Sequence, residues 1–145
     1  MNDIAIIGLR AFPSDYDGIG GIETRGEVFI KLIEPIARAR KARIYVLIRT
    51  WLKKATINQD KFSEIVKIVG IPSFPNKYFD TFVYSFLSSI LVCFIPSVKV
   101  VMYEGVGSVF FSILPKLFGK KIIFTVHSLE WRRKKWNMLG KQMLV

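Results

Sequence analysis

Residues 3–49, DIAIIGLRAFPSDYDGIGGIETRGEVFIKLIEPIARARKARIYVLIR, contain the strand, loop, helix and strand that decide the fold. Residues 3–9 are a short apolar run rich in β-branched side chains, which predicts a buried strand. From residue 22 to about residue 39, apolar residues recur at helical spacing with charged residues between them, and Pro35 is expected to bend or end this helix. Residues 43–49 predict a second strand. This order indicates a parallel βαβ unit.

The rest of the chain continues the alternation. Further strands are predicted over residues 65–71, 99–103 and 121–127, and an irregular connection over 50–63. Further helices are predicted in the uncharged run that begins at residue 81, over 107–118 with an interruption at Pro115, and over 129–144. Parallel strands of this kind are covered on both faces. We therefore predict the α/β class, with a doubly wound, mostly parallel sheet and helices on both faces.

Composition limits the kind of protein. A length of 145 residues suits one domain or a fragment of a larger protein, and 51% hydrophobic residues supply a core. The net charge of +11 favours anionic partners such as phosphates, acidic lipid surfaces or nucleic acid. A single cysteine, Cys93, and a single histidine, His127, exclude a disulfide scaffold and a zinc finger. The opening residues do not resemble a secretory signal, so we expect a cytoplasmic location.

The longest uncharged run, residues 81–98, touches the lower length limit for a membrane-spanning helix. Small polar residues share one side of it at helical spacing, and phenylalanine, leucine and isoleucine occupy the other. The polar side comprises Thr81, Ser85, Ser88 and Ser89. Pro96 ends the run early. These features favour a helix packed on a sheet over a span.

Candidate chemistry lies in the loops after the strands, because ligands bind outside the carboxyl ends of an open parallel sheet. In the first loop, Gly18, Gly20 and Gly21 precede a helix, and Glu23 falls in its first turn. Exposed backbone N–H groups and the positive end of a helix suit a phosphate or diphosphate. The spacing differs from the dinucleotide fingerprint and from the Walker pattern. A simple flexible turn is the alternative.

Two later loops also carry polar residues. Glu104 ends an apolar strand, where a buried carboxylate is costly, so it either faces a cleft or pairs with a cation, and Gly105 follows it. Gly105 could also simply begin the next helix. His127 follows the strand at 121–127 and is predicted to project toward the same cleft. An imidazole there could bond a sugar hydroxyl or a developing charge, or could be a structural hydrogen-bonding group.

The last candidate is a basic segment between two tryptophans. It comprises Trp131, Arg132, Arg133, Lys134, Lys135 and Trp136. From residue 116 to residue 145, eight basic residues face one acidic residue. The segment indicates either a packed helix with a solvated basic face or contact with an anionic membrane surface. No nucleic-acid-binding motif accompanies the charge, so nucleic acid is not expected as a partner.

Together these motifs resemble the N-terminal half of retaining family-4 glycosyltransferases of the GT-B type, in particular the bacterial rhamnosyltransferase-like group. The matching segments are residues 8–24 (GLRAFPSDYDGIGGIET), 79–90 (FDTFVYSFLSSI), 103–108 (YEGVGS) and 125–136 (TVHSLEWRRKKW). The resemblance implies a Rossmann-like acceptor-side domain over residues 1–145, incomplete at its C-terminus. It also implies transfer of a hexosyl or rhamnosyl group, with no cofactor and no metal.

The resemblance also assigns roles to individual residues. Gly20 and Gly21 would approach the diphosphate of a nucleotide-sugar donor, and His127, the catalytic candidate, would lie near the donor sugar. Glu104, Gly105 and Glu23 would line the acceptor side. The basic tryptophan segment would lie near a lipid-linked or saccharide acceptor, at the inner face of the plasma membrane.

In such enzymes the donor nucleotide is bound by a C-terminal domain that these residues do not include. We therefore expect the isolated chain to fold but to be inactive unless a donor-binding half is supplied in cis or in trans. One alternative is a non-catalytic, membrane-peripheral subunit that completes a separate donor-binding chain. A second is a basic nucleic-acid-binding domain.

Overall fold

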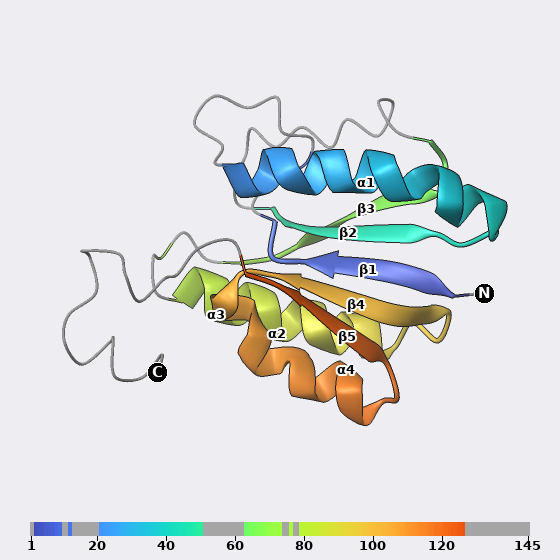
Figure 1. The fold of residues 1–145 in the computed structure, drawn as a ribbon. Coiled ribbons are helices and arrows are strands. Elements are labelled where there is room, and N and C mark those ends of the chain that lie inside the picture. Colours follow the sequence, from blue (N-terminus) through green and yellow to red (C-terminus); the bar gives the residue numbers. More distant parts are fainter. Residues whose placement is uncertain are drawn as a thin grey trace.

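The computed structural model describes residues 2–9, 12, 21–50, 63–73, 76 and 79–126, and for residues 21–23 the backbone only. This part of the chain contains the strands β1 (Asp3–Ile7), β2 (Ile44–Arg49), β3 (Val66–Ile71), β4 (Val98–Glu104) and β5 (Lys121–Thr125). All neighbouring strands pair in parallel, in the order β3-β2-β1-β4-β5 (Figure 1). The predicted parallel α/β sheet is confirmed.

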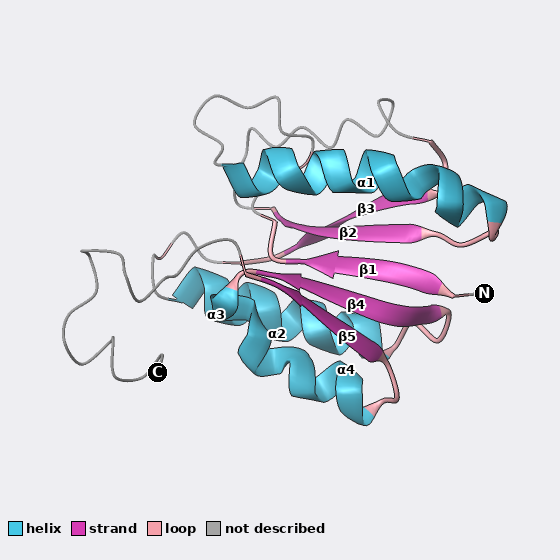
Figure 2. Ribbon diagram, in the orientation of Figure 1, coloured by secondary structure: helices cyan, strands magenta, loops and turns pink. Residues whose placement is uncertain are grey.

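Helices cover both faces of this sheet. Helix α1 (Gly21–Ala39) lies on one face, and α2 (Phe79–Cys93), α3 (Val106–Val109) and α4 (Ile113–Leu117) lie on the other (Figure 2). A short 3-10 helix, η2 (Phe110–Ser112), joins α3 to α4. The chain therefore winds in both directions from β1, as the alternation of elements predicts.

Helix α1 begins and ends within one residue of the predicted limits. The prediction that Pro35 could end it was wrong, because the helix continues to Ala39. Pro35 lies on the exposed side, whereas Ile30 and Ala37 are buried against the sheet on either side of it. We attribute the continuity of the helix to this packing, which offsets the missing hydrogen bond at proline.

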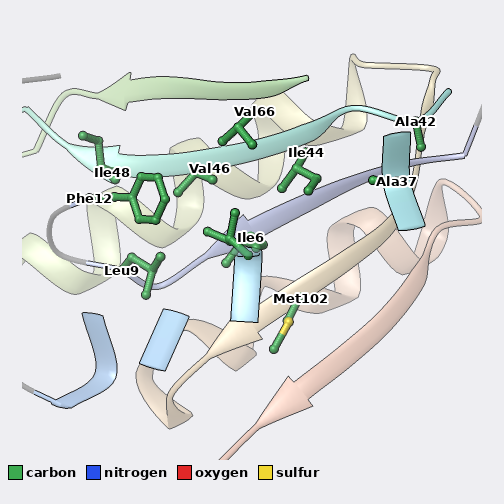
Figure 3. Close-up of a cluster of buried hydrophobic side chains, with 11 residues drawn as sticks. Ile6, Leu9, Phe12, Ala37, Ala42, Ile44, Val46, Ile48, Val66 and Met102 are labelled. Carbon is green, nitrogen blue, oxygen red and sulfur yellow. The ribbon is translucent and has the colours of Figure 1, made fainter. Parts of the chain in front are cut away.

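The core beneath α1 is built mainly from β1 and β2. Figure 3 shows its labelled side chains, Ile6, Leu9, Phe12, Ala37, Ala42, Ile44, Val46, Ile48, Val66 and Met102. Phe12 is fully buried among them, so the chain that leaves β1 is fixed to the core within a few residues. Gly26 lets α1 come close to the same point, since a Cβ there would lie 2.8 Å from Leu9 Cδ2.

On the other face of the sheet, helix α2 packs against the core with small polar side chains. Its small polar side, which includes Ser85, Ser88 and Ser89, is buried against the sheet, whereas Phe82 and Phe86 face outward. Small side chains allow the helix to approach the strands closely. The Ser89 and Tyr103 hydroxyl groups lie 2.7 Å apart and share a hydrogen bond in this layer. Leu87 and Leu91 were predicted on the opposite side but also pack against this core, so the division of α2 holds for the serines and the exposed phenylalanines only.

One detail differs from prediction. The helical segment after β4 was expected to break at Pro115, but the irregular turn is η2, and Pro115 is the third residue of α4. A proline ring needs room at the carbonyl four residues before it, so the distortion precedes the proline. The helix predicted over residues 129–144, which would follow β5, lies outside the described residues. In β5, Ile123 and Phe124 are about half exposed, because the described helices leave this edge strand partly uncovered.

Candidate functional site

The motif-bearing loops leave from three adjacent strands. β1, β4 and β5 lie side by side, with Ile7 paired to Tyr103 and Glu104 paired to Thr125. The Gly105 N–H donates to the Thr125 carbonyl oxygen at 3.1 Å, which continues the pairing past the end of β4. The carboxyl ends of these strands therefore meet at one edge, near which α1 also begins (Figure 1). This is the edge at which parallel sheets bind ligands.

Contact between Gly8 and Glu104 fixes the start of the first loop. Gly8 has a φ of 119°, in the region that favours glycine, and its N–H and carbonyl lie just beyond β1. A Cβ on Gly8 would overlap the Glu104 carbonyl oxygen and would lie 3.0 Å from Glu104 Cβ. Any larger residue would push the two strand ends apart. The backbone of the first loop thus starts directly against Glu104.

Tyr84 of α2 holds the same point from below the sheet. Its hydroxyl accepts a hydrogen bond from the Gly8 N–H at 3.0 Å and donates one to the Leu47 carbonyl oxygen at 2.6 Å. Burial raises the pKa of Tyr84 to about 12, and the Gly8 N–H offsets this only in part. The phenol therefore stays protonated at neutral pH. One side chain joins the ends of β1 and β2 to α2.

A buried ion pair stands beside this tyrosine. Arg49, the last residue of β2, places Nε 2.9 Å from Asp80 Oδ2 and donates through Nη2 to Thr81 Oγ1 at 3.4 Å. The side chains of Arg49 and Asp80 are only 5% and 13% exposed. The guanidinium carbon also lies 4.6 Å from the centre of the Tyr84 ring. These contacts tie the first turn of α2 to the sheet edge.

Sequence reasoning missed Arg49, Asp80 and Tyr84. The available signal was the one used for Glu104, a charged residue that ends an apolar strand and is costly to bury without a partner. Arg49 meets this criterion as the last residue of the strand at 43–49. Asp80 lies 31 positions further along the chain, so no local spacing connects the two. Their contact depends on the packing of α2 under β2.

Glu104 itself is buried, with 6% of its surface exposed. The turn that follows it is closed by Ser108, whose hydroxyl donates to the Gly105 carbonyl oxygen at 3.0 Å and reaches that of Glu104 at 3.4 Å. Glu104 thus belongs to the packed edge at the end of β4, between the ends of β1 and β5. Of the predicted acceptor-side residues, Glu104 and its sequence neighbour Gly105 lie at this edge.

The remaining predicted residues are described in part or not at all. Gly21 is the first residue of α1, and Glu23 lies in its first turn, although its side chain is outside the described part. The amide groups of this turn give the helix start a positive partial charge. Gly20 and His127 lie outside the described residues. So does the whole basic segment from Trp131 to Trp136.

Among the described residues, no group of three or more histidine, cysteine, aspartate or glutamate side chains could hold a metal ion. No helix in the described ranges combines the length and the hydropathy needed to cross a bilayer. No family model, curated protein or solved structure matches the chain. The motifs and the geometry of the sheet edge therefore carry the functional argument.

Proposed function

We propose that the chain is the acceptor-side half of a glycosyltransferase that moves a sugar from a nucleotide-sugar donor to a cell-surface polysaccharide or a lipid-linked oligosaccharide. One observation carries this proposal. Three of the segments on which the resemblance rests begin at the carboxyl ends of β1, β4 and β5, and these strands are neighbours in the sheet. Motifs separated by about a hundred residues thus start from one edge, as a shared site requires.

On the donor side, the diphosphate lies against Gly20 and Gly21, at the start of α1. Backbone N–H groups there stabilise negative charge that grows as the sugar–phosphate bond breaks. His127 lies near the donor sugar, which becomes oxocarbenium-like in the transition state. A donor-binding half, in cis or in trans, supplies the contacts to the nucleotide. Transfer requires both halves, so this chain alone does not turn over.

On the acceptor side, Glu104, Gly105 and Glu23 border the site. The buried position of Glu104 supports a role in shaping the edge against which an acceptor hydroxyl rests. The network of Tyr84 and Arg49 holds that edge in place through the contacts described above. The basic tryptophan segment from Trp131 to Trp136 faces a lipid-linked acceptor or the membrane. We place the protein in the cytoplasm, peripheral to the inner face of the plasma membrane.

The test joins this chain to a donor-binding half and measures donor hydrolysis and sugar transfer across a panel of nucleotide-sugars. Replacing Gly21 by valine removes close backbone approach to the diphosphate, and His127→Ala removes the imidazole. Each change is expected to lower kcat/KM by about a hundredfold or more. Arg40→Ala, an exposed change just after α1 at the opposite edge, is the control and should leave turnover unchanged.

Two results would overturn the proposal. The first is full turnover in both Gly21→Val and His127→Ala, because the assigned residues would then play no part. The second is sustained sugar transfer by the purified 145-residue chain alone. A direct binding test complements the assay: a nucleoside diphosphate added to the isolated chain should shift the amide resonances of Gly20 and Gly21. Phosphate without a nucleoside separates the diphosphate contact from base recognition.

A further inference from the structure

Large apolar side chains lie exposed across the α2 and α4 layer. On α2 the exposed positions 79, 82 and 86 repeat at helical spacing, and 110, 113 and 117 do the same on η2 and α4. Two more follow the ends of the helices. We call this set the aromatic face: Phe79, Phe82, Phe86, Phe94, Phe110, Ile113, Leu117 and Phe118.

The two helical stripes are joined by one partly buried ring. Phe111 makes edge contacts with Phe82 and Phe86, with ring centres 4.8 Å and 5.5 Å apart. Both helices also pack on the same face of the sheet (Figure 2). The two exposed stripes therefore lie on helices that pack against each other, whereas single scattered residues would need no explanation.

The charge around this surface has one sign. Among the described residues 79–126, the exposed charged side chains are the lysines Lys99, Lys116 and Lys121. The two acidic residues of that range are withdrawn from the surface, since Asp80 pairs with Arg49 and Glu104 is buried. An apolar surface rich in phenylalanine, with lysines on α4 and near the starts of β4 and β5, suits an anionic lipid layer, where rings enter the acyl boundary and ammonium groups meet the headgroups.

Helix α1 provides an internal comparison. It also exposes an apolar stripe, formed by Val28, Leu32 and Ile36. Its charged groups, however, form acid–base pairs, with Lys31 Nζ 2.8 Å from Glu27 and Arg38 Nη2 3.0 Å from Glu34. These carboxylates would lie against acidic headgroups and oppose binding. The helices of the aromatic face carry more large exposed side chains than α1 does, and no acidic residue on them is classed as exposed in the described part of the chain.

We infer that the aromatic face is the surface through which the protein lies on an anionic bilayer, with α2 and α4 parallel to the membrane plane. A second copy of the chain is a poorer occupant, because two molecules of charge +11 repel each other. The inference rests on the peripheral membrane location in the proposed function and adds the face that makes the contact. In this orientation the carboxyl edge of the sheet, with the candidate site, lies next to the membrane surface.

The test is sedimentation of the whole chain with vesicles of phosphatidylglycerol and phosphatidylcholine in equal parts, and with phosphatidylcholine alone. Wild type should bind the anionic vesicles and lose affinity as salt rises. A triple variant, Phe79→Ser, Phe110→Ser and Leu117→Ser, removes side chains that are already 62%, 77% and 77% exposed. Binding should fall by about a hundredfold or more, since burying each such side chain is worth about tenfold.

The matched control is Val28→Ser, Leu32→Ser and Ile36→Ser on α1, which should change binding by less than about twofold. A second measurement shows which face enters the lipid. Cys93 is the single cysteine, so in a Cys93→Ala background a polarity-sensitive dye can be attached at Leu117→Cys or at Leu32→Cys. On anionic vesicles the dye at position 117 should shift its emission to the blue, and the dye at position 32 should not.

The outcomes separate this inference from the broader proposals. Equal vesicle binding by wild type and the aromatic-face variant, with no dye shift at position 117, would overturn the inference and leave peripheral binding to another surface. Failure of wild type to bind anionic vesicles would overturn both. A stable dimer that the aromatic-face variant dissolves, without any effect on lipid binding, would assign the face to self-association. Sugar transfer by the joined halves is measured separately and is decided by neither result.

Discussion

Tyr84 joins three elements at the candidate site, so Tyr84→Phe is an informative perturbation. The change keeps the buried ring and its contact with Arg49 but removes the hydroxyl. That group accepts from the Gly8 N–H at 3.0 Å and donates to the Leu47 carbonyl oxygen at 2.6 Å. The Leu47 carbonyl group lies in the interior, where water cannot replace the phenol, and the Gly8 N–H is partly buried.

The magnitude follows from those two bonds. A buried N–H left without a partner costs about 1–3 kcal/mol. The carbonyl has two lone pairs and loses less, about 1 kcal/mol. We expect Tyr84→Phe to lower the free energy of unfolding by about 2–4 kcal/mol, a large share of the total for a domain of this size.

Tyr103→Phe is the matched control. Tyr103 is also fully buried, but its hydroxyl shares a hydrogen bond with the Ser89 side chain at 2.7 Å. A serine in a helix can turn to the carbonyl four residues earlier, so no backbone group is stranded. This variant should cost about 1 kcal/mol or less. Urea denaturation followed by circular dichroism measures both, with equal m-values as the condition for comparison.

Hydrogen exchange locates the effect. In Tyr84→Phe the Gly8 amide should lose protection more than amides in the middle of β1, because its bond to the phenol is gone. In Tyr103→Phe it should keep its protection. Two results would refute the proposal that the Tyr84 hydroxyl fixes the start of the first loop. One is equal stability of the two variants, and the other is exchange of the Gly8 amide as slow in Tyr84→Phe as in wild type.

Two further predictions concern the same edge. Gly8→Ala should lower the free energy of unfolding by about 3 kcal/mol or more, because the φ of Gly8 is positive and the new methyl group would overlap the Glu104 carbonyl oxygen. Gly119→Ala is the control and should cost about 1 kcal/mol, because Gly119 has a φ of 74° but no neighbouring atom in the way. Equal losses in urea denaturation would contradict this. Burial raises the pKa values of Tyr84 and Tyr103 from 10 to about 12. Below pH 10 both tyrosines are protonated in the folded and the unfolded chain, so they do not change the free energy of unfolding with pH. Between pH 10 and pH 12 the unfolded chain ionises first, so this free energy should fall by up to about 2–3 kcal/mol per tyrosine. The double variant Tyr84→Phe, Tyr103→Phe should show a shallower fall over that window, and an unchanged slope would count against the shifted pKa values.

Periodicity predicted most of the fold. Helix α1 and the strands start and end within a few residues of the limits drawn from the sequence, because one buried stripe or a short β-branched run sets each element. For helix α2, periodicity predicted the helix but not its orientation on the sheet. The spacing separates a serine side from a phenylalanine side but does not say which side packs. In the structure the serine side is buried, and Tyr84, which lies on it, makes the contacts that fasten it to the sheet.

The candidate site was predictable only where a residue ends a strand. Glu104 and Gly105 were singled out on that basis, and the structure places Glu104 against Gly8. The contact of Gly8 with Glu104 spans 96 positions and arises because β4 inserts next to β1 in the sheet. Strand order of this kind is a property of the whole packing and cannot be obtained from local spacing.

Several buried contacts hold the carboxyl ends of these strands in place. A site formed between two protein halves must keep its shape before the second half and the ligand arrive, since ordering it at that moment would weaken binding. Here the Arg49–Asp80 pair, the Tyr84 hydroxyl and the fit of Gly8 against Glu104 all fasten the ends of β1, β2 and β4 to α2 or to each other. These groups are buried, so their contacts form on folding. The fold therefore orders this edge before any ligand binds, and under the proposed function a donor-binding half would contact an edge that is already formed.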